Sequence, residues 1–342
     1  MKNIYRWLKL FGKLKSPRIK LLGLLGLHVS GRRYLGVFFD PVIACNLRCK
    51  MCYFSDAESR KSLHGTLEWN DVEAIAKALF HRTLKLQIGC GAEPTVYQRL
   101  ADVVRLGRKY HIPYISLTTN GNLLTFSKLK ELAEAGLDEL TISAHGIRRE
   151  TYEFLMTHGN YESFLRLLAD LTALKREFPA FSIRLNYTLN EDNMEELSRF
   201  WEVFRDVPLD VVQLRPIQQI GETEYANFSL QHIAACYDDI LLPLVEECRA
   251  KGITCLIPMR EHLEAIEENA IDTNKVIEDL TYCYLSPNAC WKEGFDYHRD
   301  TFESYCKRTH RVSYMLKKLF GRLEARVDTK GKTTRKLNYT VK

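Results

Sequence analysis

The stretch YLGVFFDPVIACNLRCKMC, residues 34–52, joins an apolar strand pattern to a loop that carries three cysteines. Its first part, YLGVFFDPVIA, is rich in aromatic and β-branched residues and predicts a β-strand. Cys45, Cys49 and Cys52 follow directly after this strand. Beyond the loop the chain keeps the same order, with each short apolar run followed by a stretch of helical periodicity.

This alternation continues to about residue 258. Strands are expected over residues 34–44, 84–89, 113–120, 139–144, 181–190, 210–217 and 253–258. Helices are expected over residues 70–82, with Asn70 or Asp71 near the N-cap, 97–110, 125–136, ended by Gly136, within 148–175, 193–204 and roughly 230–251. Strands that alternate with helices form a parallel sheet, because a tight hairpin cannot join parallel neighbours. The predicted fold class is therefore α/β, a partial (β/α)6 TIM-like barrel with an N-terminal helical segment and a C-terminal extension.

Charge is unevenly placed along the 342 residues. Residues 1–34 carry nine lysines and arginines and no acid, and residues 307–342 carry twelve against Glu324 and Asp328. The middle of the chain is acidic, which argues against nucleic acid as a partner there. We divide the chain into a basic amphipathic segment, a barrel, a cysteine-containing extension and a basic helix with a tail, over residues 1–34, 35–257, 258–310 and 311–342.

The spacing of the first three cysteines, C-x3-C-x2-C, indicates a metal or redox site in a chain of this size. A structural zinc site needs four ligands, and this loop supplies three. Three thiolates can instead hold three irons of a 4Fe-4S cubane and leave the fourth iron open to a cofactor or substrate. Three ordinary thiols are a weaker interpretation, because a loop near solvent leaves thiols unprotected.

The motif CNLRCKMC resembles that of the radical S-adenosylmethionine (radical SAM) superfamily, and the resemblance extends over about residues 36–220. The segment GCGAEPT, residues 89–95, is similar to the superfamily's glycine-glycine-glutamate loop after the second strand, and LTTNG, residues 117–121, is similar to the end of its third strand. The resemblance implies that the 4Fe-4S cluster is held by Cys45, Cys49 and Cys52. It also implies that S-adenosylmethionine is bound by Gly91, Ala92, Glu93, Ser143, Asn186 and Tyr53.

An enzyme is what this resemblance implies. In the superfamily the open iron binds the methionine moiety, the reduced cluster cleaves the sulfonium, and a 5'-deoxyadenosyl radical abstracts hydrogen from the substrate. The electron would come from a donor such as flavodoxin or ferredoxin, and a peptide or protein or an envelope-related small molecule stays open as the substrate. Two alternatives are a non-catalytic iron-sulfur protein, which transfers electrons or senses redox state, and a zinc-stabilised interaction module.

Three positions depart from the superfamily pattern. Met51 stands where an aromatic residue often precedes the last cysteine, and its polarizable sulfur can still pack against adenine. Ala92 replaces the second glycine, and His145 replaces an acid two positions after Ser143. We expect His145 to be a structural histidine, with a place on the substrate side as the alternative. Arg215, at the end of the sixth strand, is a candidate for substrate contact or for a surface ion pair.

The other seven cysteines fall into three groups. Cys90 lies inside the glycine loop and is expected to be a small buried residue, with a position that faces the cofactor as the alternative. Three more are expected in the core: Cys236, Cys248 and Cys255. The last three could ligate a second, auxiliary iron-sulfur cluster, with a compact cap of reduced thiols as the alternative: Cys283, Cys290 and Cys306.

Both ends of the chain have basic amphipathic patterns. Apolar residues recur on one helical face at Ile4, Trp7, Leu8, Phe11 and Leu14, and again at Met315, Leu316, Leu319, Phe320 and Leu323. Such helices either cover the open side of a barrel or lie on an anionic membrane. The sequence has no pattern of a spanning helix or a signal peptide, so we expect a cytoplasmic protein, with peripheral contact at the inner membrane face as an open alternative.

Overall fold

A curved sheet of ten strands forms the centre of the computed structural model, which describes Leu14 and residues 16–218, 221–223, 225–260, 263, 275–321 and 339–341. The strand order is β10-β7-β6-β5-β4-β3-β2-β1-β8-β9. All seven expected strands are present: β1 (Leu35–Phe39), β2 (Thr83–Ile88), β3 (Tyr114–Thr119), β4 (Glu139–Ala144), β5 (Ser182–Leu189), β6 (Val211–Pro216) and β7 (Thr254–Pro258). Each pairs in parallel with the next one along the chain, as the alternating pattern predicts.

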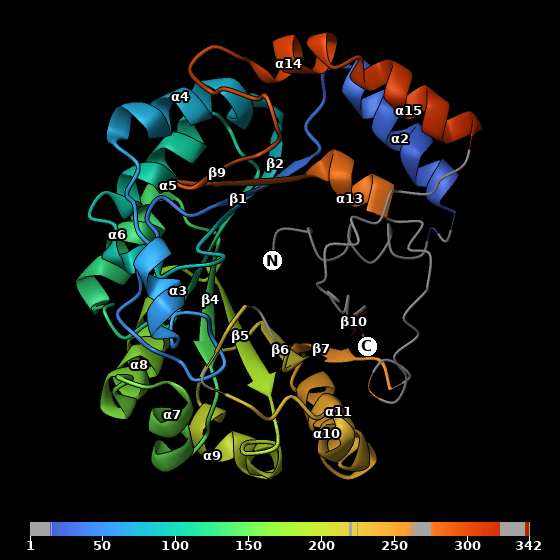
Figure 1. Ribbon diagram of the computed structural model, residues 1–342. Coiled ribbons are helices and arrows are strands. Elements are labelled where there is room, and N and C mark those ends of the chain that lie inside the picture. The colour runs from blue at the N-terminus through green and yellow to red at the C-terminus, as the bar shows by residue number, and fades with distance from the viewer. Residues whose placement is uncertain are drawn as a thin grey trace.

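Helices run around the outer face of this sheet (Figure 1). They are α4 (Trp69–Leu79), α5 (Leu100–Lys109), α6 (Phe126–Ala135), α7 (Arg149–Leu155), α8 (Tyr161–Glu177), α9 (Phe200–Phe204), α10 (Gln231–Ala235) and α11 (Leu242–Ala250). Short helices η1 (Phe80–Arg82), η2 (Pro94–Val96), η3 (Glu195–Arg199) and η4 (Tyr237–Leu241) lie between them, and α3 (Ala57–Ser62) follows the cysteine loop. The described sheet ends at two edge strands and is not closed, so the fold is a partial barrel, as expected.

Three details of the helices refine the sequence expectations. Gly136 ends α6 with φ 102°, a left-handed conformation that glycine adopts without strain. The expected N-cap of α4 is wrong, because the helix already begins at Trp69 and its N-cap position is Glu68. Asp71 lies in the first turn, where its carboxylate pairs with His298 at 3.0 Å. The expected helix over residues 230–251 is a succession of α10, the π-helical η4 and α11.

The C-terminal segment adds strands that the sequence pattern did not predict. Strand β8 (Tyr282–Ser286) pairs in parallel with β1, and β9 (Ala289–Cys290) pairs antiparallel with β8. At the other edge, β10 (Tyr339–Val341) pairs antiparallel with β7. The segment therefore extends the same sheet next to the strand that leads into the cysteine loop, while our division of the chain into four segments stays a prediction.

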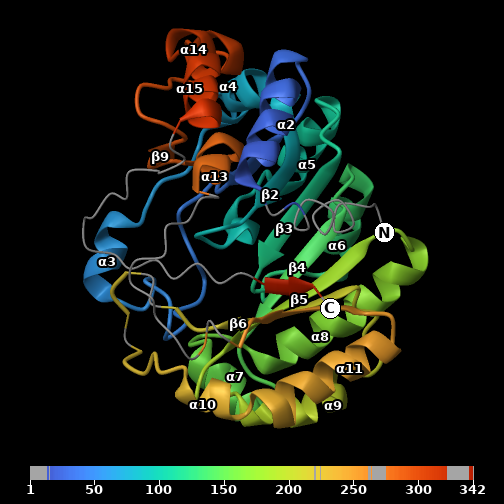
Figure 2. The same ribbon diagram turned by 90° about the vertical axis from the view of Figure 1, so that its right-hand side faces the viewer.

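Helix α2 (Pro17–Val29) packs against α13 (Lys275–Thr281) and α15 (Arg311–Phe320), which follows α14 (Phe302–Arg308) (Figure 2). A small apolar cluster joins these helices: Leu21, Val276, Leu280 and Met315. The expected apolar residues Ile4, Trp7, Leu8, Phe11 and Leu323 lie outside the described residues. Within the described part, every helix is too short or too polar to cross a bilayer.

Candidate functional site

The cysteine loop leaves the carboxyl end of β1 and is tied to the last residue of α7 and to the loop that follows it. The backbone amide of Arg48 donates to the Thr157 carbonyl and that of Lys50 to the Leu155 carbonyl, each at 2.9 Å. The Arg48 guanidinium turns back and donates to the carbonyls of Cys45 and Leu47, both at 2.7 Å. These bonds fix the loop backbone from within and from a neighbouring helix, so the three thiols sit on a defined frame.

The three thiols of the cysteine loop are each partly buried, and their charges act on one another: Cys45, Cys49 and Cys52. Burial raises the pKa of Cys45 to about 12 and raises the pKa of both other thiols, and the negative charge of neighbouring thiolates raises it further at Cys45 and Cys49. The Leu47 amide donates to the Cys45 sulfur at 3.4 Å. Three thiolates in this position need a cationic partner, and iron supplies one.

Among the described residues, no three acidic, histidine or cysteine side chains converge on a position for one metal ion. A cubane cluster does not require convergence, because each cysteine binds a different iron corner. The three cysteine thiols could supply one ligand to each of three cluster corners, which is the donor set that the sequence motif predicts.

Asp40 organises the loop that follows β2. Its buried carboxylate accepts hydrogen bonds from the amides of Cys90 and Gly91, at 2.7 and 2.9 Å, and from the hydroxyl of Tyr284 at 2.8 Å. Burial raises the pKa of Asp40, and these donors oppose that shift. The sequence pattern did not indicate Asp40 or Tyr284 as functional residues. Only the Asp-Pro step within the first expected strand could have pointed to Asp40, and nothing in the sequence paired Tyr284 with it.

Glu93 is buried, and its carboxylate is directed into the protein. It accepts from the Thr95 amide and hydroxyl at 3.1 and 2.5 Å, the Thr119 hydroxyl at 2.6 Å and the Asn120 amide at 2.8 Å. Its own amide donates to the Ala44 carbonyl at 2.9 Å, which joins the glycine loop to the cysteine loop. Glu93 thus holds the two loops together through its side chain and backbone, and any cofactor contact would come from the loop that it holds.

Two glycines have no room for a side chain. Gly89 has φ 78°, and a Cβ there would lie 2.3 Å from the Thr118 carbonyl oxygen. A Cβ on Gly91 would lie 2.8 Å from the hydroxyl of Tyr53, which itself donates to the Gly91 carbonyl. The loop is thus a cradle lined by backbone, and it brings Tyr53 beside Gly91 and Ala92.

Ser143 and Asn186 are direct neighbours in the register of β4 and β5, and Gln213 of β6 is the next residue in the same row. Asn186 accepts from Arg184 at 3.1 Å, and Arg184 also donates to Gln213. Three neighbouring strands thus place polar side chains side by side in one row.

His145 and Arg215 lie at the ends of β4 and β6. Burial and the charge of Arg215 lower the pKa of His145 to about 4, and the Ala144 backbone opposes that shift. Arg215 itself is exposed, and Met51 is buried.

The prediction of a buried Cys90 is wrong: Asp40 binds its amide, and the residue is exposed. Cys248 and Cys255 are buried as expected, whereas Cys236 is half-buried.

The three cysteines of the C-terminal segment have different surroundings. Cys283 is fully buried in β8, Cys290 donates to the Phe295 carbonyl at 3.4 Å, and the two interact electrostatically. Cys306 lies in α14, where burial raises its pKa to about 11 and Arg311, Glu303 and Arg82 are its charged neighbours. An auxiliary cluster on these residues stays a prediction.

Comparison with known proteins places this arrangement in a class. Residues 41–200 match the model of the radical SAM superfamily, a span that includes the cysteine loop, the glycine loop, Ser143 and Asn186. The chain therefore contains a radical SAM superfamily domain. Members of this superfamily use a 4Fe-4S cluster and S-adenosylmethionine, the group and cofactor that the sequence motifs predict.

Individual relatives are more distant. Proteins named probable GTP 3',8-cyclase are 28% identical over 178 residues in Metallosphaera sedula and 27% identical over 182 residues in Saccharolobus solfataricus; these matches include 52% of this chain and 54% and 55% of those proteins. The match thus spans about half the length of these relatives. Streptococcus suis SuiB bound to S-adenosylmethionine superposes with a TM-score of 0.57 at 14% identity, over 75% of this chain and 59% of SuiB. Native anSMEcpe with bound AdoMet gives 0.53 at 16%, over 66% and 64%.

Proposed function

We propose that the protein is a radical SAM enzyme that reductively cleaves S-adenosylmethionine. The observation that carries this proposal is the direct connection between the two loops, made by the hydrogen bond from the Glu93 amide to the Ala44 carbonyl at 2.9 Å. An iron-sulfur protein without a cofactor would need the cysteine loop but not a glycine cradle fixed beside it.

In this proposal Cys45, Cys49 and Cys52 hold the cluster. The backbone at Gly91 and Ala92, with Tyr53, Ser143 and Asn186, holds the nucleoside cofactor. When bound, the cluster and cofactor supply reductive sulfonium cleavage and a 5'-deoxyadenosyl radical that abstracts hydrogen from a substrate. The protein orients the cofactor through Asp40 and Glu93, which fix the cradle without occupying it.

The remaining polar row indicates a polar substrate. Arg184 and Gln213 lie beside Asn186, and the half-buried Lys85 interacts electrostatically with Glu139 and Arg184. Arg184 already meets Asn186 and Gln213, and these polar groups suit a polar substrate better than an apolar one. The relatives suggest two classes to try, a nucleotide such as GTP, from the names of the curated relatives, and a peptide, since SuiB was solved with the precursor peptide SuiA.

The decisive experiment is anaerobic. Reconstituted protein, reduced with dithionite and given S-adenosylmethionine, is expected to release 5'-deoxyadenosine, and its electron paramagnetic resonance signal is expected to change when the cofactor is added. Cys49→Ala should lose both results, whereas Cys236→Ala, outside the loop, should keep them. A cluster that ignores S-adenosylmethionine would favour the non-catalytic alternative, and zinc in a colourless protein would favour the interaction module.

We propose a flavodoxin or ferredoxin as the natural electron donor, to be tested by replacing dithionite with each reduced protein.

The same preparation tests the auxiliary cluster. About four irons per chain would indicate one cubane, and about eight would indicate a second. If Cys290→Ala and Cys306→Ala leave the iron content unchanged, the auxiliary cluster is excluded.

We propose that the α2–α15 surface contacts an anionic membrane. The two helices pack together and expose large apolar side chains, among them Ile19 at 57%, Leu22 at 56% and Phe320 at 81%. Basic residues such as Arg18 and Lys317 lie on the same helices. Flotation with anionic vesicles should be reduced by Leu22→Ser with Phe320→Ser and unaffected by Leu123→Ser on another face. Equal flotation without anionic lipid would contradict the proposal.

A further inference from the structure

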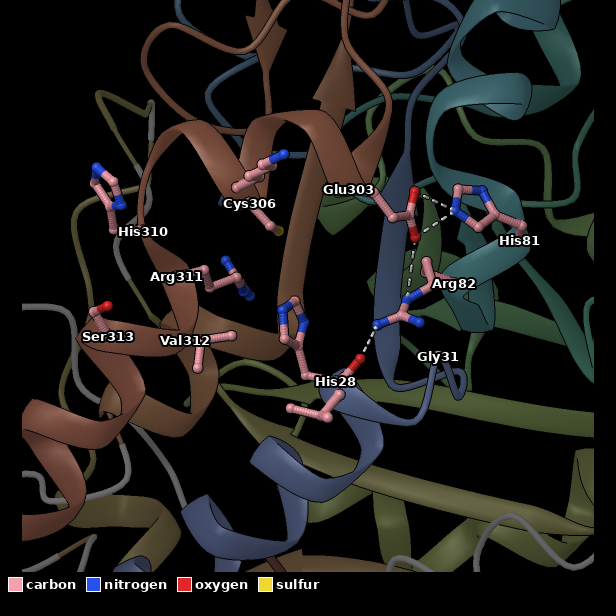
Figure 3. Close-up of a pocket in the computed structure, with 12 residues that line it drawn as sticks. His28, Gly31, His81, Arg82, Glu303, Cys306, His310, Arg311, Val312 and Ser313 are labelled. Atoms are coloured by element: carbon pink, nitrogen blue, oxygen red, sulfur yellow. Dashed lines mark hydrogen bonds and ion pairs between the residues drawn. The ribbon is translucent and has the colours of Figure 1, made fainter.

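A cavity lies away from the cysteine and glycine loops, at the junction of α2, η1, α14 and α15. It has a volume of about 590 Å³, within the range of small-molecule sites. Figure 3 shows His81, Arg82 and Glu303 on one side and Arg311 and His310 on the other, with His28 between them. None of these residues belongs to the cofactor site described above.

Positive charge dominates the lining. The cationic side chains are Arg82, Lys307 and Arg311, and Glu303 is the one carboxylate. Glu303 is itself engaged, because both its oxygens bind His81, at 2.9 and 2.8 Å, and one lies 3.7 Å from Arg82. The cavity therefore keeps an excess of positive charge that nothing in the described lining neutralises.

The two arginines are buried. Arg82 is 4% exposed and Arg311 is 8% exposed. Their guanidinium carbons lie 5.2 and 5.5 Å from the centre of the same Phe302 ring, and Figure 3 shows Arg311 directed toward His28 from the side opposite Arg82. Two like charges held near one ring repel each other, so their position is costly unless an anion joins them.

The partners of these arginines are mostly neutral. Arg82 donates to the His28 carbonyl at 2.9 Å, and Arg311 donates to the Leu280 carbonyl. The Nε of Arg311 is buried and has no hydrogen-bond partner among the described residues. His28 reports the same positive field, because burial and the charges of both arginines lower its pKa to about 4.

The start of α15 adds backbone donors to the same cavity. Arg311, Val312 and Ser313 form its first turn and all line the cavity. The first amides of an α-helix have no acceptor within the helix, and its N-terminus carries partial positive charge. The N-cap residue His310, at φ 52°, makes no side-chain cap that would occupy those amides.

We propose that this cavity binds the phosphoryl group of a small molecule. Guanidinium groups from opposite sides, an ammonium group and the amides of a helix N-terminus surround one place, which suits a tetrahedral dianion with several acceptor oxygens. The phosphoryl group could belong to a soluble metabolite or to a lipid headgroup, since α2 and α15 also form the exposed apolar surface. Both sources present the same chemistry to the cavity.

The test uses full-length protein with its cluster and follows thermal unfolding and calorimetric binding. Inorganic phosphate and glycerol 3-phosphate, compared with chloride at equal ionic strength, should raise the melting temperature. Arg311→Lys should weaken phosphate binding about tenfold, because lysine keeps the charge but loses the two parallel donors of the guanidinium. Lys307→Gln should weaken it about threefold, because it removes a charged donor. Lys77→Gln, an exposed substitution on α4, should change nothing.

The arms of the experiment separate the two sources. If phosphatidic acid vesicles compete with phosphate, the source is a lipid headgroup, and if only the soluble esters bind, it is a metabolite. The proposal fails if phosphate gives no more stabilisation than chloride, or if binding is equal in wild type and Lys307→Gln. Lys307 is an exposed lysine, so this variant decides even if Arg311→Lys fails to fold.

Discussion

Asp40 supports the glycine loop with both oxygens of one buried carboxylate. In Asp40→Asn an amide group would face at least one of three donors, and hydrogen bonds to a charged acceptor contribute about 1.5 to 3 kcal/mol. We expect S-adenosylmethionine to bind about tenfold more weakly, with unchanged iron content. Anaerobic equilibrium dialysis measures the first quantity and iron analysis the second.

The control is Asp206→Asn, a substitution of an exposed acid, which should leave both quantities unchanged. Loss of iron together with the cofactor in Asp40→Asn would show that Asp40 supports the cysteine loop and not the cradle alone.

His145 gives the molecule an acid-sensitive position. Its pKa of about 4 lies below the usual 6.5, because burial and Arg215 disfavour the charged form. Between pH 4 and pH 6.5 the unfolded state binds a proton at His145 more readily than the folded state does. The contribution of neutral His145 to stability is therefore present near pH 7 and is lost as pH falls toward 4. We expect His145→Gln to reduce the acid loss of unfolding free energy by up to about 3 kcal/mol. Denaturant unfolding at pH 7 and pH 4.5 measures this loss of unfolding free energy. An equal loss in the wild type and in His145→Gln would contradict the prediction.

At the scale of residues, the sequence predicted the thiols and the polar positions but not how they are supported. Cys45, Ser143 and Asn186 are recognisable because their spacing and their places at strand ends are local properties. Asp40 and Tyr284 were missed because their hydrogen bond joins positions 244 residues apart. Glu93 was found, but its Thr95 and Thr119 partners become visible only once the loops are folded.

At the scale of elements, neighbouring strands couple Ser143 and Asn186. Their register makes them adjacent, and both belong to the proposed cofactor site. We expect Ser143→Ala and Asn186→Ala to act non-additively on cofactor affinity, with a coupling energy of about 0.5 to 3 kcal/mol. A double-mutant cycle from dialysis gives this value. The control cycle combines Ser143→Ala with Thr95→Ala, which lies on another loop. If the effects are equally additive in both cycles, Asn186 does not act together with Ser143 at the cofactor site.

Parallel strands between helices were predictable because the apolar periodicity and the turn residues between segments agree over β1 to β7. Strand β8 was missed because YCYLS is short, aromatic and without a clear period, and its partner β1 is at the start of the barrel. The N-cap of α4 was misplaced because Asn70 and Asp71 are strong cap residues, whereas the helix began earlier, at Trp69.

At the scale of the whole molecule, the C-terminal segment supports the site near the N-terminus. Tyr284 of β8 donates to Asp40, so Tyr284→Phe should lower the unfolding free energy by about 1 kcal/mol and weaken cofactor binding several-fold. Chemical denaturation and anaerobic dialysis measure the two effects. Tyr282→Phe, with a half-exposed ring on the same strand, should change neither, and an unaffected Tyr284→Phe would disconnect the segment from the cradle.

The place of β8 also sets an order of events during synthesis. The first strand leaves the ribosome long before its neighbour is made, because Tyr284 of β8 and its partner Asp40, directly after β1, are 244 residues apart. At about 5 to 20 residues per second that interval lasts tens of seconds, during which one edge of β1 stays unpaired. The support that Tyr284 gives to Asp40 would then form only after β8 has been made, and chains stalled before β8 would be natural clients for chaperones.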